Sequence, residues 1–462
     1  MNRALKAPSI LDDFHALEAM TRRPVRSAAE LDANLSHIYA ALAGIDLDAR
    51  DLDELKDAAP ALMQGIFELR MKIKGQIADW HRLGLVTPAV EKSIRDVFRV
   101  SRYAGDMLGE LNDGYDQLDP GEMRLRAFSG ANYNTLVNPG FNDGYDIPFR
   151  DGDVMLVRGT AHNSAAIARI GDVDTQFSHV GIIHFDREGK GWMVEALIEQ
   201  GSSITPLEEA LSHDLGRAVL YRHRNADLAA GAARLIHDRV KKSLGRLRRP
   251  ILYDFTMRLE GYETLYCSKL IRSAFEGASL GQVILPTFKT RLDMKNRDFF
   301  DAVGVSATET FAPGDIDIEP EFDLVAEWQD YRMTSALRMQ DLLMDKIFEW
   351  MEKHGWKFEE DFMIRLVSVL GKGSSYLSEE AKNLMKSVAP KVPINMPRRT
   401  IAVIAMLHRT GEGLLQDLKA FEQNTIRMRG RPAMPREIDA HLESVRERSG
   451  GHIGYLAAPR IV

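Results

Sequence analysis

The chain has 462 residues, 45% of them hydrophobic and 27% charged, which is the balance of a globular protein with two or three domains. This composition excludes a largely disordered chain, a collagen and a coiled-coil rod. The longest unbroken apolar run, Ile401 to Leu407, is much shorter than the ~20 residues that cross a bilayer, so no transmembrane helix is expected. A net charge of −7 argues against general nucleic-acid binding, which needs a basic face.

The single cysteine, Cys267, has no partner for an internal disulfide, and one thiolate cannot form a zinc cluster. The N-terminal stretch is interrupted by Pro8, Asp12 and Asp13, so it contains no apolar segment of the kind that directs Sec export. We therefore expect a protein that is made in the cytoplasm and either acts there or leaves by a route other than Sec. We expect no metal and no cofactor.

The first region, residues 1–125, has the pattern of a helical bundle. Ser27 and Glu30 form a capping box, in which each side chain satisfies a backbone N–H group at the start of a helix. Apolar residues follow at helical spacing: Leu31, Leu35, Ile38, Tyr39 and Leu42. Between 126 and 152, Asn, Gly, Pro and Asp are frequent, as turns require, and this predicts a linker loop.

The second region, residues 153–330, alternates in short β-type runs. We predict strands at 153–158, 178–185, 192–197 and 218–222, and helices around 227–247 and 267–277. Several short strands with few helices favour an α+β unit. The last region, 331–462, is helical again, with a linker at 389–399, where three prolines prevent a continuous helix.

Cys267 lies at the start of the predicted helix 267–277. There the unpaired backbone N–H groups and the positive end of the helix dipole favour the thiolate, which is the nucleophilic form of cysteine. A lone buried cysteine is more often inert filler. A catalytic thiol therefore also needs a base and a group that orients the base.

His179 and Glu195 are the candidates for the base and the orienting group. His179 begins the strand 178–185, where a histidine is more often structural or exposed, and Glu195 lies in the apolar run of the next strand, where burying a carboxylate is costly. Because side chains alternate between faces, the register decides whether the two meet. An odd number of residues in the turn near 186–191 puts them on one face. An even number separates them unless a bulge corrects the register.

Short motifs of the middle region occur in the order seen in a known enzyme family. They are Gly152-Asp153, Ser178-His179-Val180-Gly181-Ile182, Val194-Glu195-Ala196, Thr205-Pro206-Leu207, Tyr253-Asp254-Phe255, Tyr266-Cys267-Ser268, Pro313-Gly314-Asp315 and Val325-Ala326-Glu327-Trp328. Over about 145–330 the chain resembles the permuted NlpC-like cysteine amidases of the YiiX type. The resemblance implies an α+β fold with a circularly permuted papain-like core, flanked here by N-terminal and C-terminal helical regions. The histidine precedes the cysteine, as in the permuted branch.

The resemblance implies that Cys267 is the nucleophile, His179 the general base and Glu195 the residue that holds the imidazole. A thiolate–imidazolium pair would then form a thioester, with the Cys267 backbone N–H stabilising the oxyanion. Tyr253 and Asp254 match a motif near the substrate groove of the family, and Asp254 would receive a substrate ammonium group, although an exposed loop pair is the alternative.

Lys269 departs from the family pattern, in which this position is acidic. We expect its side chain to point away from Cys267 and to alter the charge preference for substrate or partner.

Three functions remain open at this point. The first is a cysteine hydrolase that cleaves an amide bond in a peptidoglycan-type peptide, a γ-glutamyl bond or an isopeptide bond. The second is a lipid-directed acyl hydrolase or acyltransferase, phospholipase-like, with the same Cys/His pair, as in lecithin:retinol acyltransferase-like proteins. The third is a non-catalytic module that binds protein partners through its helical flanks. An apolar groove would favour the lipid, whereas an acidic pocket near Tyr253 and Asp254 would favour an amino-terminated peptide.

Two further expectations concern surfaces. A basic cluster is interpreted as a solvated helix face, with an anionic lipid or polymer surface as the alternative: Lys241, Lys242, Arg246, Arg248 and Arg249.

A core of about 185 residues can bury its own apolar centre, so the flanks are not needed for it to fold. We expect the region 1–125 to pack on this core and narrow access to Cys267. An independent, tethered bundle is the alternative.

Overall fold

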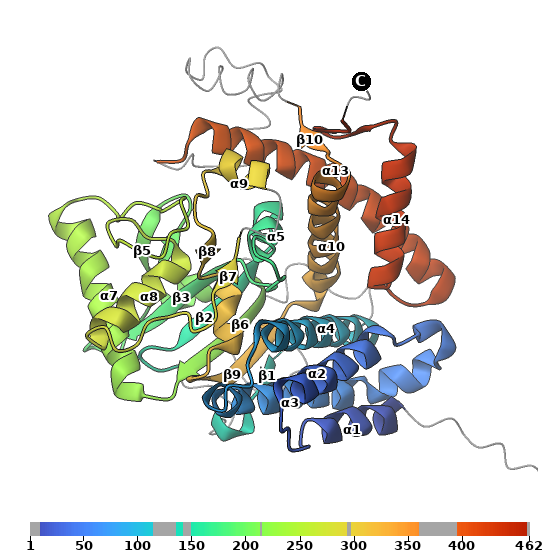
Figure 1. The fold of residues 1–462 in the computed structure, drawn as a ribbon, viewed down its shortest axis with the longest axis horizontal. Helices are drawn as coiled ribbons and strands as arrows, with labels where there is room; N and C mark the ends of the chain where they lie inside the picture. The colour runs from blue at the N-terminus through green and yellow to red at the C-terminus, as the bar shows by residue number, and fades with distance from the viewer. Residues whose placement is uncertain are drawn as a thin grey trace, which may run out of the picture.

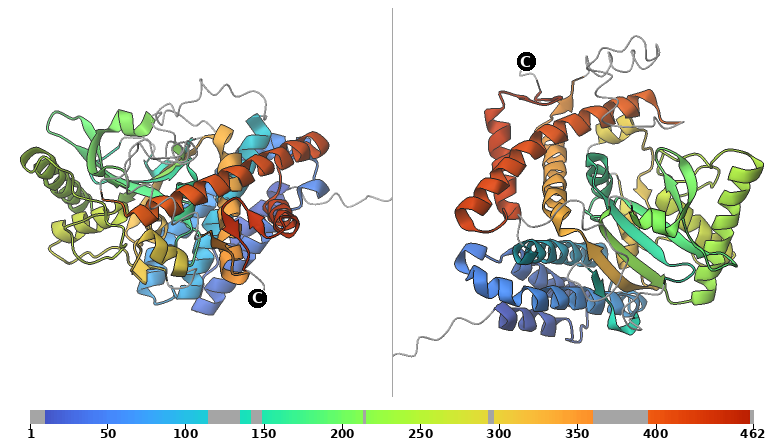
Figure 2. Two further views of the ribbon diagram at one scale, coloured as in Figure 1. Left: turned by 90° about the horizontal axis from the view of Figure 1, so that it is seen from above. Right: turned by 180° about the vertical axis from the view of Figure 1, so that it is seen from behind.

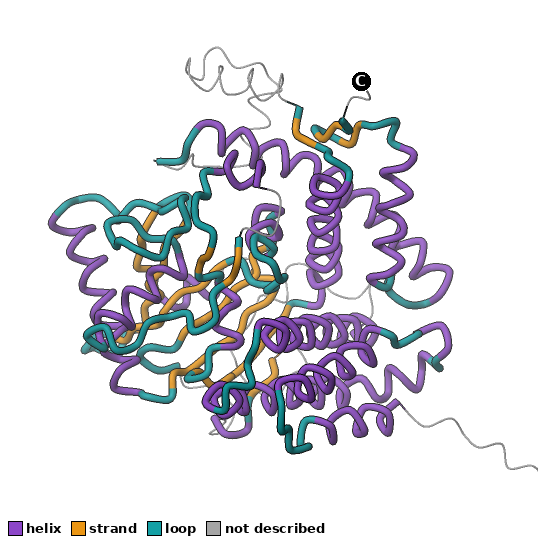
Figure 3. Tube along the Cα trace, in the orientation of Figure 1, coloured by secondary structure: helices purple, strands orange, loops and turns teal. Residues whose placement is uncertain are grey.

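The computed structural model describes residues 10–113, 135–141, 149–212, 215–292, 297–359 and 395–459. Most of its strands gather in one part of the molecule with helices on several sides of them, and a few short strands lie apart near the C-terminus (Figure 3). The N-terminal helices lie along one edge of the sheet, and the C-terminal helices stand beside them (Figure 1). None of the described helices is long and apolar enough to span a membrane.

The centre of the fold is a seven-stranded sheet in which every pair of neighbours is antiparallel. In spatial order its strands are β1 (Thr135–Val137), β9 (Phe322–Gln329), β6 (Leu215–His223), β2 (Val154–Gly159), β3 (His179–Phe185), β4 (Gly191–Leu197) and β5 (Gly201–Pro206). The predicted strands in the middle region are present. Strand β5 was not predicted, and β1 lies within the segment 126–152 that we expected to be only a loop. The rest of that segment is partly outside the described residues.

Helices α7 (Ala226–Arg246) and α8 (Cys267–Ala278) pack on one face of the sheet and share its main apolar core. A smaller apolar cluster on the sheet includes α6 (Leu207–Ser212). Helix α5 (His162–Ala168) is inserted between β2 and β3 and packs among the C-terminal helices. The short pieces η2 (Pro139–Phe141), β7 (Thr290–Arg291), β8 (Glu309–Thr310) and η3 (Pro313–Ile318) complete this region.

The N-terminal helices form a bundle with its own apolar core, as the periodicity predicts. They are α1 (Ile10–Met20), α2 (Ala28–Ala43), η1 (Leu47–Ala49), α3 (Leu52–Arg82) and α4 (Pro88–Asp113). At the start of α2 the Ser27 hydroxyl accepts a hydrogen bond from the Glu30 N–H at 3.2 Å, and the Glu30 carboxylate accepts one from the N–H of Arg26. The predicted cap therefore forms.

Buried ion pairs join this bundle to the sheet. Arg70 of α3 contacts Glu327 of β9 at 2.8 Å, and Arg102 of α4 contacts Asp317 of η3 at 2.7 Å. Both guanidinium groups and both carboxylates are buried. A tethered, independent bundle would not bury charges against its neighbour, because each unpaired buried ion is costly. The bundle is therefore packed on the core.

The C-terminal helices form a fourth apolar cluster together with α5. The elements are α9 (Arg297–Val303), α10 (Tyr331–Lys353), β10 (Lys357–Phe358), α13 (Arg398–Arg429), α14 (Pro435–Arg448), β11 (His452–Ile453) and β12 (Leu456–Ala457). The views from above and from behind show α13 crossing beside α10 (Figure 2). Of the linker predicted at 389–399, residues 389–394 lie outside the described part of the chain.

Candidate active site

Cys267 is the first residue of α8, as the sequence predicts. The preceding N-cap residue, Tyr266, provides no side-chain cap, because its hydroxyl lies 2.9 Å from the Thr310 hydroxyl instead. Tyr266 therefore provides no N-cap acceptor for the first backbone N–H groups of α8, and hydrogen bonding by the Ser268 N–H helps to lower the pKa of Cys267. These N–H groups and the helix dipole favour negative charge at Cys267, both on the thiolate and on an oxyanion formed beside it.

His179 and Glu195 lie on one face of the β3–β4 hairpin. The pairing of Phe185 with Gly191 closes a turn over residues 186–190, an odd number, and Ile182 pairs with Val194. This register places the two side chains on the same side, as the odd turn requires. His179 Nε2 is 2.6 Å from Glu195 Oε2. With Nε2 engaged, Nδ1 is the nitrogen that remains for the thiol.

The thiol and the imidazole shift each other toward the charged pair. Burial alone would raise the pKa of Cys267, but hydrogen bonding with His179 and the positive charge of His179 outweigh it and lower that pKa. Burial likewise opposes charge on His179, yet Cys267 and Glu195 raise the pKa of His179 to about 10. The arrangement therefore favours a thiolate beside an imidazolium.

Two supporting residues were not found from the sequence. Thr205 of β5 donates a hydrogen bond to Glu195 Oε1 at 3.4 Å, and the Ser268 hydroxyl lies 3.9 Å from the Cys267 sulfur. Ser268 also helps to lower the pKa of Cys267. Both residues belong to the motifs quoted above. The sequence could have indicated them by their positions, because Ser268 follows Cys267 in the chain and Thr205 lies on the strand that pairs with that of Glu195. Without a predicted β5, the contact of Thr205 was not visible.

Tyr253 lies beside the nucleophile. Its segment forms a parallel bridge with Leu265, two residues before Cys267, and its ring is buried next to that of Phe255. Burial and then the charge of Cys267 raise the pKa of Tyr253 well above its usual value. The phenol is therefore neutral and close to the reacting sulfur.

Asp254 is paired within the protein, which corrects its expected role as a receptor for a substrate ammonium group. Its Oδ2 accepts a hydrogen bond from Lys269 Nζ at 2.8 Å, and its Oδ1 accepts from the N–H and the hydroxyl of Thr256. Lys269 also donates to the Glu260 carbonyl. Both Asp254 and Lys269 are buried. The ammonium group that neutralises Asp254 thus comes from α8 itself.

The same contact corrects our expectation for Lys269. We expected Lys269 to alter the charge preference for substrate or partner, but its side chain turns inward and ties the first turn of α8 to the segment that carries Tyr253. The acidic residue usual at this position in the family would face the carboxylate of Asp254 and repel it. In this chain Lys269 therefore neutralises Asp254 within the protein.

The helical flanks approach the site differently from our expectation. Arg102 of α4 lies over the ring of Phe177, and the Arg99 carbonyl accepts from the Gln176 side chain. The N-terminal bundle thus supports the chain just before His179, and among the described residues none of its hydrogen bonds or ion pairs reaches Cys267. In contrast, Asn395 donates a hydrogen bond to the Tyr253 carbonyl at 2.8 Å. The flank next to the nucleophile is the C-terminal one.

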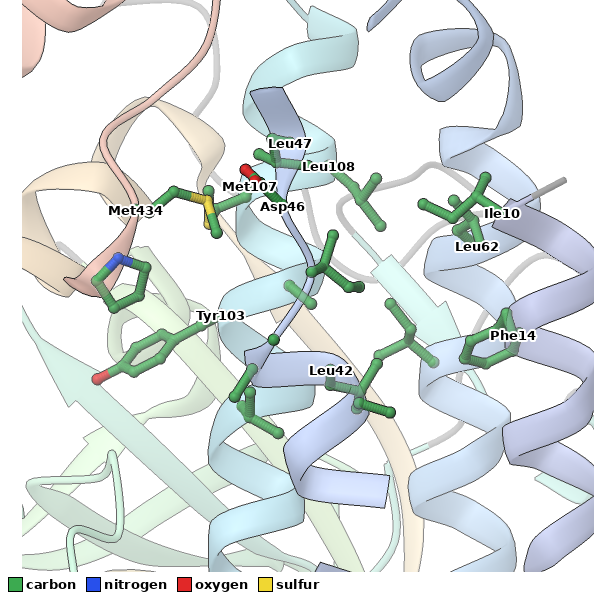
Figure 4. A pocket seen from close by; sticks show the side chains of 18 of the residues that line it. Ile10, Phe14, Leu42, Asp46, Leu47, Leu62, Tyr103, Met107, Leu108 and Met434 are labelled. Atoms are coloured by element: carbon green, nitrogen blue, oxygen red, sulfur yellow. The ribbon is translucent and has the colours of Figure 1, made fainter. Parts of the chain in front are cut away.

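A large cavity of about 990 Å³ lies in the N-terminal bundle, away from Cys267. Figure 4 shows its apolar lining from α1, α2, α3 and α4 with Met434 at one side. None of the candidate site residues lines it. It also borders Ile10 and Leu111, next to residues that the structure does not describe, so nothing in the structure shows what covers it.

Among the described residues, no three His, Cys, Asp or Glu side chains are arranged to hold a metal ion. The histidine at the other end of β3, His184, contacts Asp151 at 2.9 Å and lies against the ring of His237. The geometry of Cys267, His179 and Glu195 suits nucleophilic acyl transfer without further groups.

Comparison with known families agrees with the motifs. Residues 148–313 match the family model described as permuted papain-like amidase enzyme, YaeF/YiiX, C92 family. This segment contains Cys267, His179 and Glu195, and it excludes both helical flanks and strands β1 and β9. No curated protein matches the chain.

Proposed function

We propose that the segment matching the permuted papain-like amidases, residues 148–313, is a cysteine hydrolase that cleaves an amide bond through a thioester on Cys267. The family match supports a cysteine hydrolase acting on amides. The observation that carries the residue assignment is the contact of His179 Nε2 with Glu195 at 2.6 Å, which leaves Nδ1 for the thiol. Cys267 is then the nucleophile, His179 the general base and acid, and Glu195 the positioning residue.

In the first half-reaction the Cys267 thiolate attacks the carbonyl carbon, and the carbonyl oxygen gains the negative charge. The backbone N–H of Cys267 stabilises this oxyanion at the uncapped start of α8. The His179 imidazolium gives its proton to the leaving nitrogen as the C–N bond breaks, so an amine leaves and a thioester remains. In the second half-reaction neutral His179 takes a proton from water, the hydroxide attacks the thioester, and the thiolate is released with the carboxylic acid.

We infer a peptide-type substrate with a free amino group, such as a peptidoglycan-type peptide, a γ-glutamyl compound or an isopeptide. Asp254 is neutralised by Lys269, so it does not support this inference. Glu199, however, is exposed at the β4–β5 turn, and its charge acts on Tyr253. No described residue forms an ion pair with Glu199. This carboxylate replaces Asp254 as the candidate receptor for a substrate ammonium group.

A lipid acyl hydrolase or acyltransferase would use the same Cys/His pair, but the large apolar cavity that would favour it lies away from Cys267. The decisive experiment is therefore to trap the acyl-enzyme and weigh it by mass spectrometry after incubation with amino-terminated γ-glutamyl peptides and, separately, with phospholipid. A peptidic adduct on Cys267 is the expected result. A fatty acyl adduct would replace the amide substrate with a lipid. If neither substrate gave an adduct and Cys267 were no more reactive than a free thiol, the protein would be a non-catalytic module.

Glu199→Gln tests the substrate inference separately. Loss of the carboxylate should raise KM for an amino-terminated peptide about tenfold and leave kcat unchanged, because the residue contacts substrate away from the reacting bond. Glu188→Gln, which removes a charge from the β3–β4 turn at the other end of β4, is the matched control. Equal KM values for all three proteins would remove Glu199 from the site while leaving the catalytic assignment intact.

A further inference from the structure

The C-terminal end of α7 carries a dense group of cations. Residues 241–249 include five that are all exposed: Lys241, Lys242, Arg246, Arg248 and Arg249. Within the described part of the chain, none of the five forms an ion pair. The nearest acidic residue along the helix, Asp238, has its carboxylate 3.4 Å from His237 Nδ1. This end of the helix therefore has a concentrated positive charge in a chain whose net charge is −7.

Two leucines are exposed among these cations. Leu244 is 40% exposed and Leu247 is 58% exposed. They are three positions apart, a spacing that places side chains next to each other on a helix. Large apolar side chains scattered singly over a surface are ordinary. Two adjacent ones enclosed by five cations form instead a compact amphipathic tip, which we call the α7 tip (residues 241–249).

The backbone of the α7 tip is held in place. The Ser243 carbonyl accepts hydrogen bonds from the N–H groups of Leu247 and Arg249, and the buried Ser243 hydroxyl donates to the Arg249 carbonyl at 2.8 Å. Arg248 has a φ of +53°, a left-handed conformation that helix ends usually assign to glycine. The tip thus presents its leucines and arginines from a fixed turn, and little backbone conformational entropy would be lost when it binds.

The helix dipole accounts for cations at a helix C-terminus, since they interact favourably with its negative end. It does not account for the two leucines, which water solvates poorly. An anionic polymer would also bind the cations, but it provides no apolar phase for Leu244 and Leu247. A bilayer with anionic headgroups matches both features, because cations bind the headgroups while apolar side chains enter the acyl boundary.

We propose that the α7 tip is a docking site for the surface of an anionic lipid bilayer. Helix α7 lies at the outer edge of the molecule, on the opposite side of the sheet from the C-terminal helices, in the views of Figures 1 and 2. The tip can therefore reach a flat surface without rearrangement of the fold. Since the chain as a whole is acidic and is repelled by such a surface, binding depends on this local group of cations.

The first test uses the full chain and vesicles of phosphatidylcholine and phosphatidylglycerol in equal parts, with pure phosphatidylcholine vesicles for comparison. The protein should float with the anionic vesicles, not with the neutral ones, and should dissociate as the salt concentration rises. Leu244→Ser/Leu247→Ser should weaken binding roughly tenfold. The matched control is Leu83→Ser/Met428→Ser, which removes two side chains that are 68% and 73% exposed elsewhere. It should bind like the parent protein.

The second test removes charge from the α7 tip. Lys241→Gln/Lys242→Gln/Arg246→Gln should weaken vesicle binding about a hundredfold, at about fivefold for each cation. The matched control removes three exposed cations from the flanks: Lys56→Gln, Arg82→Gln and Arg427→Gln. All variants change exposed residues, and unchanged alkylation of Cys267 will show that they remain folded.

Three results would overturn the proposal. They are no binding to anionic vesicles, equal weakening by the tip and control variants, and binding that needs the cations but not the leucines and is displaced completely by soluble polyphosphate. The last result would identify the α7 tip as a site for an anionic polymer. None of these outcomes bears on the cleavage of amides by Cys267, so the two proposals fail independently.

Discussion

Residue chemistry at this site depends on small groups of side chains that neutralise one another. His179 is held between a thiol and a carboxylate, and Asp254 is held between a lysine and a threonine. Each group is mostly buried, so removing one member leaves a charge without compensation. The candidate catalytic residues and their support can therefore be tested by single substitutions.

Alkylation of Cys267 by iodoacetamide should be fast and nearly independent of pH through neutrality. The thiolate–imidazolium pair exists above the pKa of Cys267, which is lowered, and below the pKa of His179, which is raised to about 10. In His179→Ala the labelling rate near neutral pH should fall at least about tenfold and should rise only as the pH passes the ~8.5 of a free thiol. His184→Ala, on the same strand, is the control and should retain the parent profile. Identical profiles for His179→Ala and the parent would show that His179 does not activate the thiol.

Lys269→Met should lower the free energy of unfolding by about 3–5 kcal/mol, because it leaves the carboxylate of Asp254 buried without its cation. Lys269→Met/Asp254→Leu should recover most of this loss in a denaturant titration. Lys289→Met breaks an exposed pair with Glu309 and should cost less than about 1 kcal/mol. If Lys269→Met proved as mild as Lys289→Met, the buried pair would have no structural role.

Elements were predicted best where local periodicity is strong. The N-cap of α2, the strands β2, β3 and β4, and the helices α7 and α8 lie close to their predicted ranges. Helix α5, by contrast, has only seven residues and was not predicted. A helix this short is stabilised mainly by packing, here of Ala165 and Ala166 in the apolar cluster of α10 and α13.

The packing of α5 against α13 should make stability sensitive to acid. His162 of α5 is buried, and burial lowers its pKa to about 4, from an ordinary value near 6.5, although Glu412 opposes this. The unfolded chain therefore binds a proton between about pH 6.5 and 4 that the folded chain does not, and stability falls as the pH falls through this range. The loss is at most about 3 kcal/mol. His162→Asn should reduce the decrease in Tm between about pH 7 and 5, whereas His15→Asn, on the surface of α1, should not. A parent Tm that is constant over this range would contradict the prediction.

The whole molecule is built from four apolar clusters, and buried charges join the N-terminal bundle to the rest. Arg70 and Glu327 are 257 positions apart in the chain, and Arg102 and Asp317 are 215 apart. Farther along α4, Arg338 of α10 donates two hydrogen bonds to Glu110. The N-terminal bundle is thus fastened both to the sheet and to the C-terminal helices.

This arrangement leads us to predict the opposite of our expectation that the middle region folds without its flanks. A fragment of residues 149–330 loses the cations that neutralise Glu327, Asp317 and Asp315, together with the apolar cover that Phe67 provides to the main core. We predict that it will be insoluble or will lack near-ultraviolet circular dichroism, whereas the full chain will show both solubility and a cooperative transition. A soluble, cooperatively folded fragment that still alkylates Cys267 at the parent rate would restore the original expectation.

The sequence by itself determined the local structure and the types of residue at the site. Caps, periodicity and turn length act over a few residues, so they predicted Cys267 at the start of a helix and the condition under which Glu195 shares a face with His179. The tertiary structure decided the partners of charged residues. Whether Asp254 is free for substrate depends on Lys269, and which flank lies beside the nucleophile depends on the contact between Asn395 and Tyr253. Such choices are made by packing between segments distant in the chain, where desolvation requires each buried charge to find a partner that no local pattern specifies.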